Sequence, residues 1–517
     1  MSRRFLGRGR TFILLAVGVS ASVGAACGRR PTRELRAVLA EPVVSLDPFL
    51  SSAEADRLLQ GRPGRGGFTL LFNIYESLVW FREDRKPEPA LAVAWHNPDA
   101  LTWVFDLRRG VRLHDGSTLT AADIVAVINH MRATDAMMAP HLRMVESATA
   151  EGDYTVRIKT KTPAPLLLSQ LSFVPVKPKA GVSEPGQPPN GTGPFRYAGR
   201  DPDGTHRLEA FAGHWRGRPV WDRVSVSVET KSEARLARLV RGEADFVENL
   251  APAELEELRR RPELEVLPGA VKDTVVLGLP AGGGASNPFG DPRVREAVDR
   301  SIDRIGLARE RALGFAHPAS QFVSPNVFGR IPGLPLVERD VSRARELLGP
   351  TRYAKGFTCS VLCETDLADS ARAIARDVAA VGITLEIQTA IREEVQRRLE
   401  QGEGQAFLVR ARALAADGSD LLLNYFHTRN PAARQGMLNW SGFSDPELDE
   451  LIDSARAADD SATRFERLAR AMVLAVQSRA MLPLVTRHDA HGGRKGMTFS
   501  VEPRGYVRFV DVTPPRP

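Results

Sequence analysis

The sequence has few of the residues and none of the local motifs on which many enzymes depend. It contains three cysteines among 517 residues and no G-x-S-x-G, H-E-x-x-H, C-x-x-C or Walker-type pattern. Its ten histidines are scattered, and the closest pair, His488 and His491, would face the same way only in a helix. We therefore expect no built-in metal and no cofactor. The absence of these motifs does not exclude a catalytic site whose residues come together only in the folded chain.

The sequence also lacks the concentrated positive charge of a nucleic-acid-binding protein. Its formal net charge is +7, but residues 1–26 contain four arginines and no acidic residue, so much of the excess belongs to that segment. No dense run of lysine and arginine follows. We expect no nucleic-acid partner. The length predicts two or three domains.

The first 27 residues have the pattern of an export signal. A basic start precedes an uncharged run, residues 11–26, and small residues lie directly before Cys27. The run is shorter than the roughly 20 apolar residues that span a membrane. The segment resembles a bacterial lipoprotein signal peptide, which implies lipidation of Cys27; the alternative is a chance cysteine after an ordinary signal. Residues 2–6 also resemble part of a twin-arginine signal, so the export route stays open.

Two local patterns in the second half of the chain predict its packing. Cys359 and Cys363 lie four apart in a predicted strand, residues 357–363. Four strand residues span roughly 13 Å, which exceeds the roughly 7 Å limit for a disulfide, so both cysteines are expected in the core. Ser444 and Glu447 have the spacing of a capping box and predict a helix start.

The stretch of residues 90–133 predicts a strand, a turn and a helix in close succession. Residues 103–108 alternate with a period near two, which favours a strand. Gly116 follows an aspartate in a turn dipeptide. Thr120 is expected to begin a helix, with Asp123 three residues later as in a capping box.

This block resembles the signature of extracytoplasmic solute-binding proteins of family 5, which serve ABC transporters for oligopeptides, dipeptides and nickel. Together the motifs are specific, and the resemblance extends over residues 35–501. The matching segments are LRRGV at 107–111, HDG at 114–116, TAADI at 120–124, SLDP at 45–48, GTGPF at 191–195, HWRG at 214–217, GEAD at 242–245, DPRVREA at 291–297 and IDR at 302–304.

The resemblance implies an α/β protein with two lobes and a ligand cleft between them, a type II periplasmic-binding-protein-like fold. Within that fold class it implies the large cluster, whose members carry an extra subdomain. Strands that alternate with helices agree with α/β lobes. We expect a signal peptide at residues 1–27, lobe I at 28–67, 186–271 and 487–517, an extra subdomain of lobe I at 68–185, and lobe II at 272–486.

Residues 407–426 carry the first candidate for ligand binding. In the resembled family, a W-x-x-D-x-x-[DE]-P motif lies here, and its first aspartate accepts the α-ammonium of the ligand in the peptide binders. That aspartate corresponds to Asp417, and a carboxylate beside an ammonium makes charge-assisted hydrogen bonds. Leu414 and Leu421 replace the Trp and the Pro of the motif. The alternative is that Asp417 has no ligand contact and instead caps a helix as an Asx residue or lies in a solvated turn.

Further candidates are backbone and arginine groups near the expected cleft. Val43 and Val44 lie beside the SLDP segment and could pair with an extended peptide by strand addition. Arg410 and Arg412 share one face of the predicted strand and could clamp a ligand carboxylate, or could be ion-paired at the surface. Arg487 lies near a segment that lines the cleft in the resembled family.

Trp440 offers a surface on which a ligand could stack, and its alternative is an ordinary buried tryptophan. With it, the predicted ligand-binding set is Asp417, Val43, Val44, Arg412, Arg410, Trp440 and Arg487.

The sequence thus predicts an exported, lipid-anchored and monomeric substrate-binding protein of an ABC importer, in the periplasm or at the cell surface, and not an enzyme. It would close two lobes over an extended solute, most simply a short peptide, and deliver it to a permease in the cytoplasmic membrane. Three alternatives stay open. They are a ligand sensor that presents its closed state to a membrane receptor, a binder of oligosaccharide or metal chelate, and an extracytoplasmic hydrolase.

Overall fold

The computed structural model describes most of the chain after the signal segment. Residues Arg33–Pro517 form one compact unit. Cys27 lies outside the described residues, so the lipid anchor stays a prediction. Arg412, a predicted ligand-binding residue, also lies outside them. None of the described helices is both long and apolar enough to cross a membrane. The described residues are 32–51, 53–54, 65–81, 86–182, 188–282, 287–312, 316–324, 327–411, 417–458, 460–500, 502 and 505–515.

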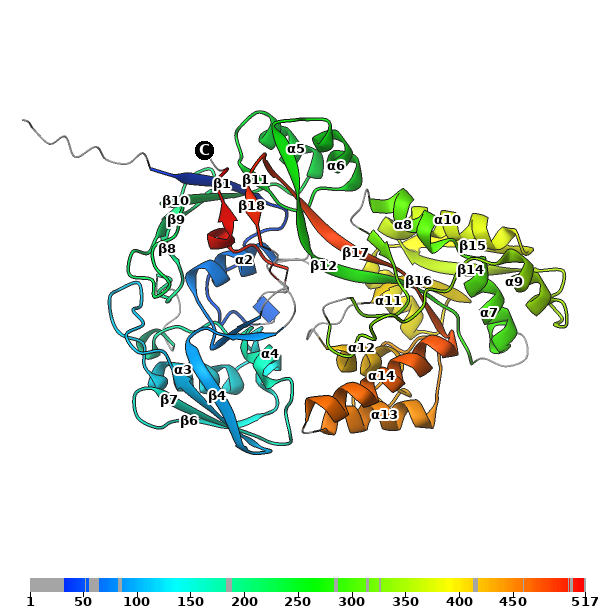
Figure 1. Cartoon of the computed structure of the whole chain (residues 1–517), viewed down its shortest axis with the longest axis horizontal. Helices are drawn as coiled ribbons and strands as arrows, with labels where there is room; N and C mark the ends of the chain where they lie inside the picture. Colours follow the sequence, from blue (N-terminus) through cyan, green and yellow to red (C-terminus); the bar gives the residue numbers. More distant parts are fainter. Residues whose placement is uncertain are drawn as a thin grey trace, which may run out of the picture. The chain divides into compact units, whose positions relative to one another are not determined.

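Strands and helices alternate through the chain, and the expected α/β class is confirmed (Figure 1). Among the described residues, eleven strands form one mixed sheet in the order β15-β14-β16-β12-β17-β11-β1-β10-β9-β8, with β13 paired to β17. The strands are β1 (Glu34–Leu39), β8 (Phe195–Arg200), β9 (His206–Ala210), β10 (Arg223–Val228), β11 (Phe246–Val247), β12 (Leu264–Gly278), β13 (Ala316–Pro318), β14 (Phe357–Glu364), β15 (Ile383–Ala390), β16 (Ala406–Ala411) and β17 (Met481–Arg494).

A separate four-stranded antiparallel sheet forms the extra subdomain, with the order β4-β5-β7-β6. The predicted strand, turn and helix all occur there. Gly116 has a φ of +90°, and the Asp123 carboxylate accepts the N–H of Thr120 at 2.8 Å, which closes the capping box. The elements are β2 (Val79–Phe81), β3 (Pro87–Pro89), β4 (Ala92–Asp99), β5 (Thr102–Leu107), α3 (Ala121–Ala133), β6 (Val145–Ala150), β7 (Thr155–Thr160) and α4 (Leu167–Leu171).

Lobe II has two hydrophobic cores, one on each face of its strands. Cys359 and Cys363 are buried free thiols, as expected. The helix predicted to begin at Ser444 instead has Asp445 as its N-cap, whose carboxylate accepts the N–H of Glu447 at 2.9 Å. The helices are α7 (Pro292–Ser301), α8 (Arg304–Ala312), α9 (Val341–Leu348), α10 (Ala368–Ala379), α11 (Arg392–Glu400), α12 (Gly418–Tyr425), α13 (Pro446–Ala457) and α14 (Ser461–Ser478).

The remaining described elements belong mostly to lobe I. The C-terminal segment returns to it, because Val507, Phe509 and Val512 are buried in the same core as β1. These elements are α2 (Arg65–Ile74), α5 (Ser232–Val240), α6 (Pro252–Arg259), β18 (Thr498–Phe499), β19 (Val512–Thr513) and the short 3₁₀ turns η1 (Ala139–Leu142), η2 (Lys179–Gly181), η3 (Pro288–Gly290), η4 (Thr365–Leu367) and η5 (Phe509–Asp511).

Strands β12 and β17 form a long antiparallel ribbon in the middle of the large sheet (Figure 1). Their register shifts on both sides of Val271. The cores change at the same place, because Leu267 of β12 packs in the core of β1 whereas Val275 packs in a core of lobe II. The predicted boundaries 271/272 and 486/487 therefore fall inside two paired strands. A register shift is a local weakness in the hydrogen-bond ladder, and it marks where the ribbon could bend.

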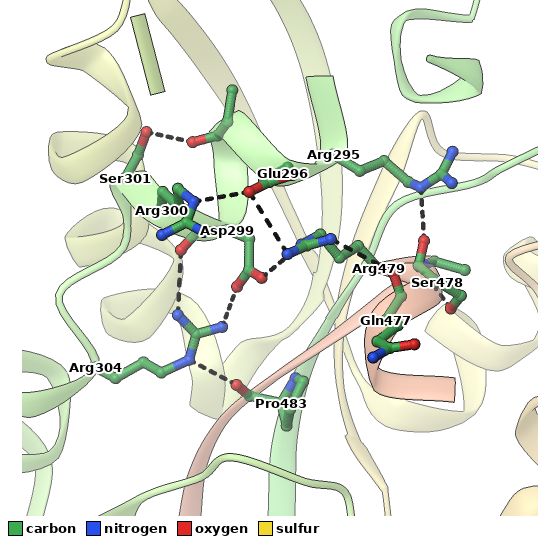
Figure 2. Close-up of polar contacts among 12 residues, drawn as sticks. Arg295, Glu296, Asp299, Arg300, Ser301, Arg304, Gln477, Ser478, Arg479 and Pro483 are labelled. Carbon is green, nitrogen blue, oxygen red and sulfur yellow. Dashed lines mark hydrogen bonds and ion pairs between the residues drawn. The ribbon is translucent and has the colours of Figure 1, made fainter. Parts of the chain in front are cut away.

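A buried cluster of charges, here called the Asp299 cluster, joins α7 to the turn between α14 and β17 (Figure 2). The Asp299 carboxylate accepts hydrogen bonds from Arg304 and from Arg479, the latter at 3.1 Å. Arg304 also donates to the Pro483 carbonyl at 2.8 Å, and Arg295 donates to two backbone carbonyls at 2.7 and 2.9 Å. The DPRVREA and IDR motifs therefore build the scaffold of lobe II.

Candidate ligand-binding site

Residues of the extra subdomain and of lobe II line one cavity of 680 Å³, here called the Asp417 cavity. Its wall is mixed, with aromatic and proline side chains beside a few polar and charged groups, which is typical of small-molecule sites. The lining residues are Phe81, Pro87, Asn97, Asp99, Ala100, Trp103, Pro163, Ala164, Pro165, Leu166, Leu168, Ser169, Phe328, Asp417, Ala458, Ser461 and Arg464.

Asp417 lies in the cavity wall, and each of its carboxylate oxygens has a hydrogen-bond partner in lobe II. It is the N-cap of α12, and one carboxylate oxygen accepts the N–H of Ser419 at 2.8 Å. The other oxygen lies 2.5 Å from Nη1 of Arg464. The backbone around Asp417 is held by the N–H of Gly418, which donates to the carbonyl of Phe328 at 2.8 Å. The Asx cap considered from the sequence is therefore present, and a ligand contact of Asp417 stays a prediction.

Arg464 is the partner that sequence reasoning missed. It is 4% exposed, its Nη2 donates to the Ser419 hydroxyl at 3.0 Å, and its guanidinium lies 5.0 Å from the ring centre of Phe328. A signal was present in the sequence, because Arg464 stands at the start of the buried stripe of α14, followed by Leu468 and Met472. An arginine at a core position of a helix indicates a buried acceptor.

Three aromatic side chains form part of the wall of the Asp417 cavity. Trp103 of β5, Phe81 of β2 and Phe328 all line the Asp417 cavity. The indole of Trp103 also stacks on Phe105, with the ring centres 6.3 Å apart. Residue 414, where the resembled family has its tryptophan, lies outside the described residues.

The arginines predicted to clamp a ligand have partners within the protein. Arg410 is ion-paired to Glu364 and, at 2.8 Å, to Asp366, so the ion pair considered from the sequence is present, but the Glu364 side chain is buried and not at the surface. Arg487 makes two hydrogen bonds to Asp273, at 2.7 and 2.8 Å, across the β12–β17 ribbon. Burial lowers the pKa of Arg487, but the hydrogen bonds and charge of Asp273 outweigh that effect and leave the pKa raised. These pairs fix neighbouring strands.

The other predicted residues lie away from the Asp417 cavity. Trp440 packs edge-on against Phe407 and Tyr425 in a lobe II core, with ring centres 5.9 and 6.1 Å apart. Val43 and Val44 are half-buried, and neither lines the Asp417 cavity. The SLDP segment that follows them lines a second cavity, of 1160 Å³. Of the predicted ligand-binding residues that the structure describes, Asp417 alone lines the Asp417 cavity.

Comparison with known proteins identifies the family. Residues 86–433 match the family described as "Bacterial extracellular solute-binding proteins, family 5 Middle". The chain belongs to this family. Proteins of the family are extracytoplasmic, bind small solutes and work with the membrane permeases of ABC importers. The predicted family and the two-lobed periplasmic-binding-protein fold are both confirmed.

Similar relatives have been named for several solutes. The glutathione-binding protein GsiB of Pectobacterium atrosepticum is 25% identical over 87% of this chain and 88% of its own length. A probable di/tripeptide-binding protein 5 of Pseudomonas aeruginosa is 25% identical over 81% and 86%. The structure of HbpA2 from Haemophilus parasuis superposes with a TM-score of 0.80 at 21% identity, over 93% of this chain and 99% of that one. DppA of Helicobacter pylori, in complex with the peptide STSA, gives a TM-score of 0.68 at 22% identity, over 93% and 98%.

Proposed function

We propose that this family 5 protein captures a short peptide by closing its two lobes and delivers it to a permease in the cytoplasmic membrane. One observation carries the proposal: the Asp417 cavity is lined from the extra subdomain and from lobe II together. A solute that contacts both sides binds the closed state more tightly than the open state. Only such differential affinity shifts the population toward closure.

The β12–β17 ribbon supports this mechanism, because it continues from one lobe into the other and its register is interrupted beside Val271. We propose that the lobes turn there as near-rigid bodies. The small-peptide ligand is favoured by the relatives named for glutathione and for di- and tripeptides. We further propose that the protein acts as a monomer held to the membrane by a lipid on Cys27.

A thermal-shift screen of the purified protein tests the ligand. The panel contains di- to pentapeptides, oligosaccharides and nickel chelates. A ligand at 100 times its dissociation constant stabilises the native state by about 2.7 kcal/mol, which is readily seen. A shift with peptides that Trp103→Ala abolishes, and that the exposed control Glu447→Ala retains, supports the proposal. A shift with sugars or chelates alone contradicts the peptide ligand.

Uptake of the labelled ligand distinguishes transport from sensing. Deletion of the gene abolishes uptake if the protein delivers its ligand to a permease. Uptake that continues unchanged in the deletion strain contradicts the transport role and favours a sensor.

A further inference from the structure

Two N–H donors in the wall of the Asp417 cavity have no acceptor among the described residues. They are Nε of Arg464 and the indole Nε1 of Trp103, and both atoms are buried. Buried polar groups in native proteins are nearly always hydrogen-bonded, so such exceptions call for a partner. Trp103 belongs to the extra subdomain and Arg464 to lobe II, so a residue with an unpartnered donor lines the cavity on each of its two sides.

The charge of Asp417 is already balanced inside the protein. Arg464 lies 2.5 Å from one of its carboxylate oxygens, and the two residues are 2% and 4% exposed. The arginine thus occupies the place at which the ammonium of a peptide ligand was expected to bind. A ligand ammonium would have to compete with Arg464 for the Asp417 carboxylate, and its gain at that carboxylate would be correspondingly small.

We propose that the Asp417 cavity selects its solute by an acidic group and does not require a free ammonium. A ligand carboxylate supplies the acceptor oxygens that Arg464 and Trp103 lack, and its bond to the guanidinium is charge-assisted. Phe81 and Phe328 offer apolar walls for the rest of the solute. The inference rests on the proposed function, because it takes this cavity as the solute site. The class it names is small carboxylic acids, including peptides with a blocked amino terminus.

Calorimetric titration of the purified protein with matched ligands tests this selection. The probes are the tripeptide Ala-Phe-Ala in its free, N-acetylated, C-amidated and doubly blocked forms, together with N-acetylphenylalanine. We expect N-acetylation to leave the dissociation constant nearly unchanged. Amidation removes the acid and should weaken binding by about tenfold or more, because each 1.4 kcal/mol of lost interaction is a factor of ten.

The possible outcomes separate the two proposals. Binding that N-acetylation abolishes and amidation leaves intact overturns the acidic selection while the peptide-binding function stands. Binding of N-acetylphenylalanine with no form of the tripeptide supports the acidic selection and overturns the peptide ligand. No binding by any of the five probes contradicts both.

Two variants test the assigned donors. Trp103→Phe removes the indole N–H but keeps an aromatic ring. It should weaken binding of the acidic probes by about tenfold and leave the dissociation constants of the amidated probes unchanged. Trp95→Phe, a half-buried tryptophan of the same subdomain outside the cavity, is the matched control. Equal losses for acids and amides in Trp103→Phe would overturn the role of the N–H.

Arg464→Met leaves Asp417 without its cation and should invert the preference, so that the free tripeptide binds better than its N-acetylated form. A purely structural role for Arg464 predicts no inversion. Should this variant fail to fold, the acid-against-amide comparison in Trp103→Phe still decides the proposal.

Discussion

The Asp299 cluster and the Asp417–Arg464 pair are both buried charge sites of lobe II, but their hydrogen bonds differ. In the Asp299 cluster, all three guanidinium nitrogens of Arg304 have an oxygen partner, and both carboxylate oxygens of Asp299 are used (Figure 2). In the Asp417 pair, Nε of Arg464 has no acceptor among the described residues, and the pair borders a cavity. A completed network fixes a scaffold, whereas an incomplete one at a cavity leaves capacity for a ligand.

A third buried carboxylate extends the comparison. Glu248, which follows β11, accepts the N–H of Ala40 at 3.0 Å, and its carboxylate makes no ion pair with the described residues. Arg235 lies nearby but donates to the backbone carbonyl of Glu248 at 2.7 Å. Burial, with the nearby charges of Glu41 and Asp489, raises the pKa of Glu248 to about 7. Among the described residues, the Asp299 carboxylate therefore has two arginine partners, the Asp417 carboxylate has one, and the Glu248 carboxylate has none.

The largest expected effect is in the completed cluster. Asp299→Ala leaves the buried Arg304 without its carboxylate and removes one of the two carboxylate partners of the half-buried Arg479, and it should lower the free energy of unfolding by about 3–5 kcal/mol. Urea denaturation measures this loss. Glu447→Ala removes an exposed pair with Arg470 and should cost less than about 1 kcal/mol. Equal effects of the two variants would contradict a structural role for the cluster.

Glu248 should make stability fall with rising pH. Its pKa is near 7 in the folded protein and near its ordinary value of about 4.5 when unfolded, so the native state holds the extra proton between these values. The penalty therefore grows from about pH 4.5 to about pH 7 and reaches at most about 3 kcal/mol, from about 1.36 kcal/mol per pKa unit. Glu248→Gln keeps the acceptor for Ala40 and should remove this slope. A parallel pH dependence of the two proteins in urea denaturation would contradict the raised pKa.

Asp417→Asn sharpens the comparison between the two lobe II sites. The amide oxygen can still cap α12, but the charged partner of Arg464 is lost. We expect about 1.5–3 kcal/mol less stability, in the range of hydrogen bonds to charged groups. Thermal and urea unfolding measure the change. A loss of stability as large as that of Asp299→Ala would contradict the difference between the two sites and would give the Asp417–Arg464 pair the same structural role as the Asp299 cluster.

Asp445 separates the cap from the ion pair, because it caps α13 as Asp417 caps α12 but does so at the exposed surface. Asp445→Ala should cost about 1 kcal/mol, the usual contribution of an N-cap. Ser444→Ala, the position favoured by the sequence, should cost less than about 0.5 kcal/mol, as surface substitutions usually do. The reverse order in urea denaturation would contradict the observed cap.

The local elements were predictable where one short segment decides the structure. The strand, the turn and the helix start between residues 103 and 123 follow from periodicity, turn chemistry and the capping box, and the buried cysteines follow from their spacing in a strand. Ser444 was the wrong cap because Asp445 directly follows it, and the two residues are equally plausible caps in isolation. The predicted lobe boundary 271/272 lies within the long strand β12, which the sequence predicted only from residue 273 onward, because a bulged long strand reads like two short ones.

The candidate site was predictable only in part, because its partners are distant in sequence. Asp417 was found through a motif, but Arg464 lies on another helix and Trp103 on another subdomain. Arg410 and Arg487 were plausible clamps until Glu364 and Asp273 were seen beside them. A charged residue alone does not reveal whether its partner is the protein or a ligand; only the three-dimensional set of acceptors does.

A crystal structure of the protein with bound N-acetylated Ala-Phe-Ala is the most direct test of the central claim. The account predicts the ligand in the Asp417 cavity, with Asp417 and Arg464 still paired and acceptor oxygens of the ligand, its carboxylate among them, within hydrogen-bond distance of Nε of Arg464 or Nε1 of Trp103. A ligand bound elsewhere, or one whose carboxylate points away from both donors, would contradict it.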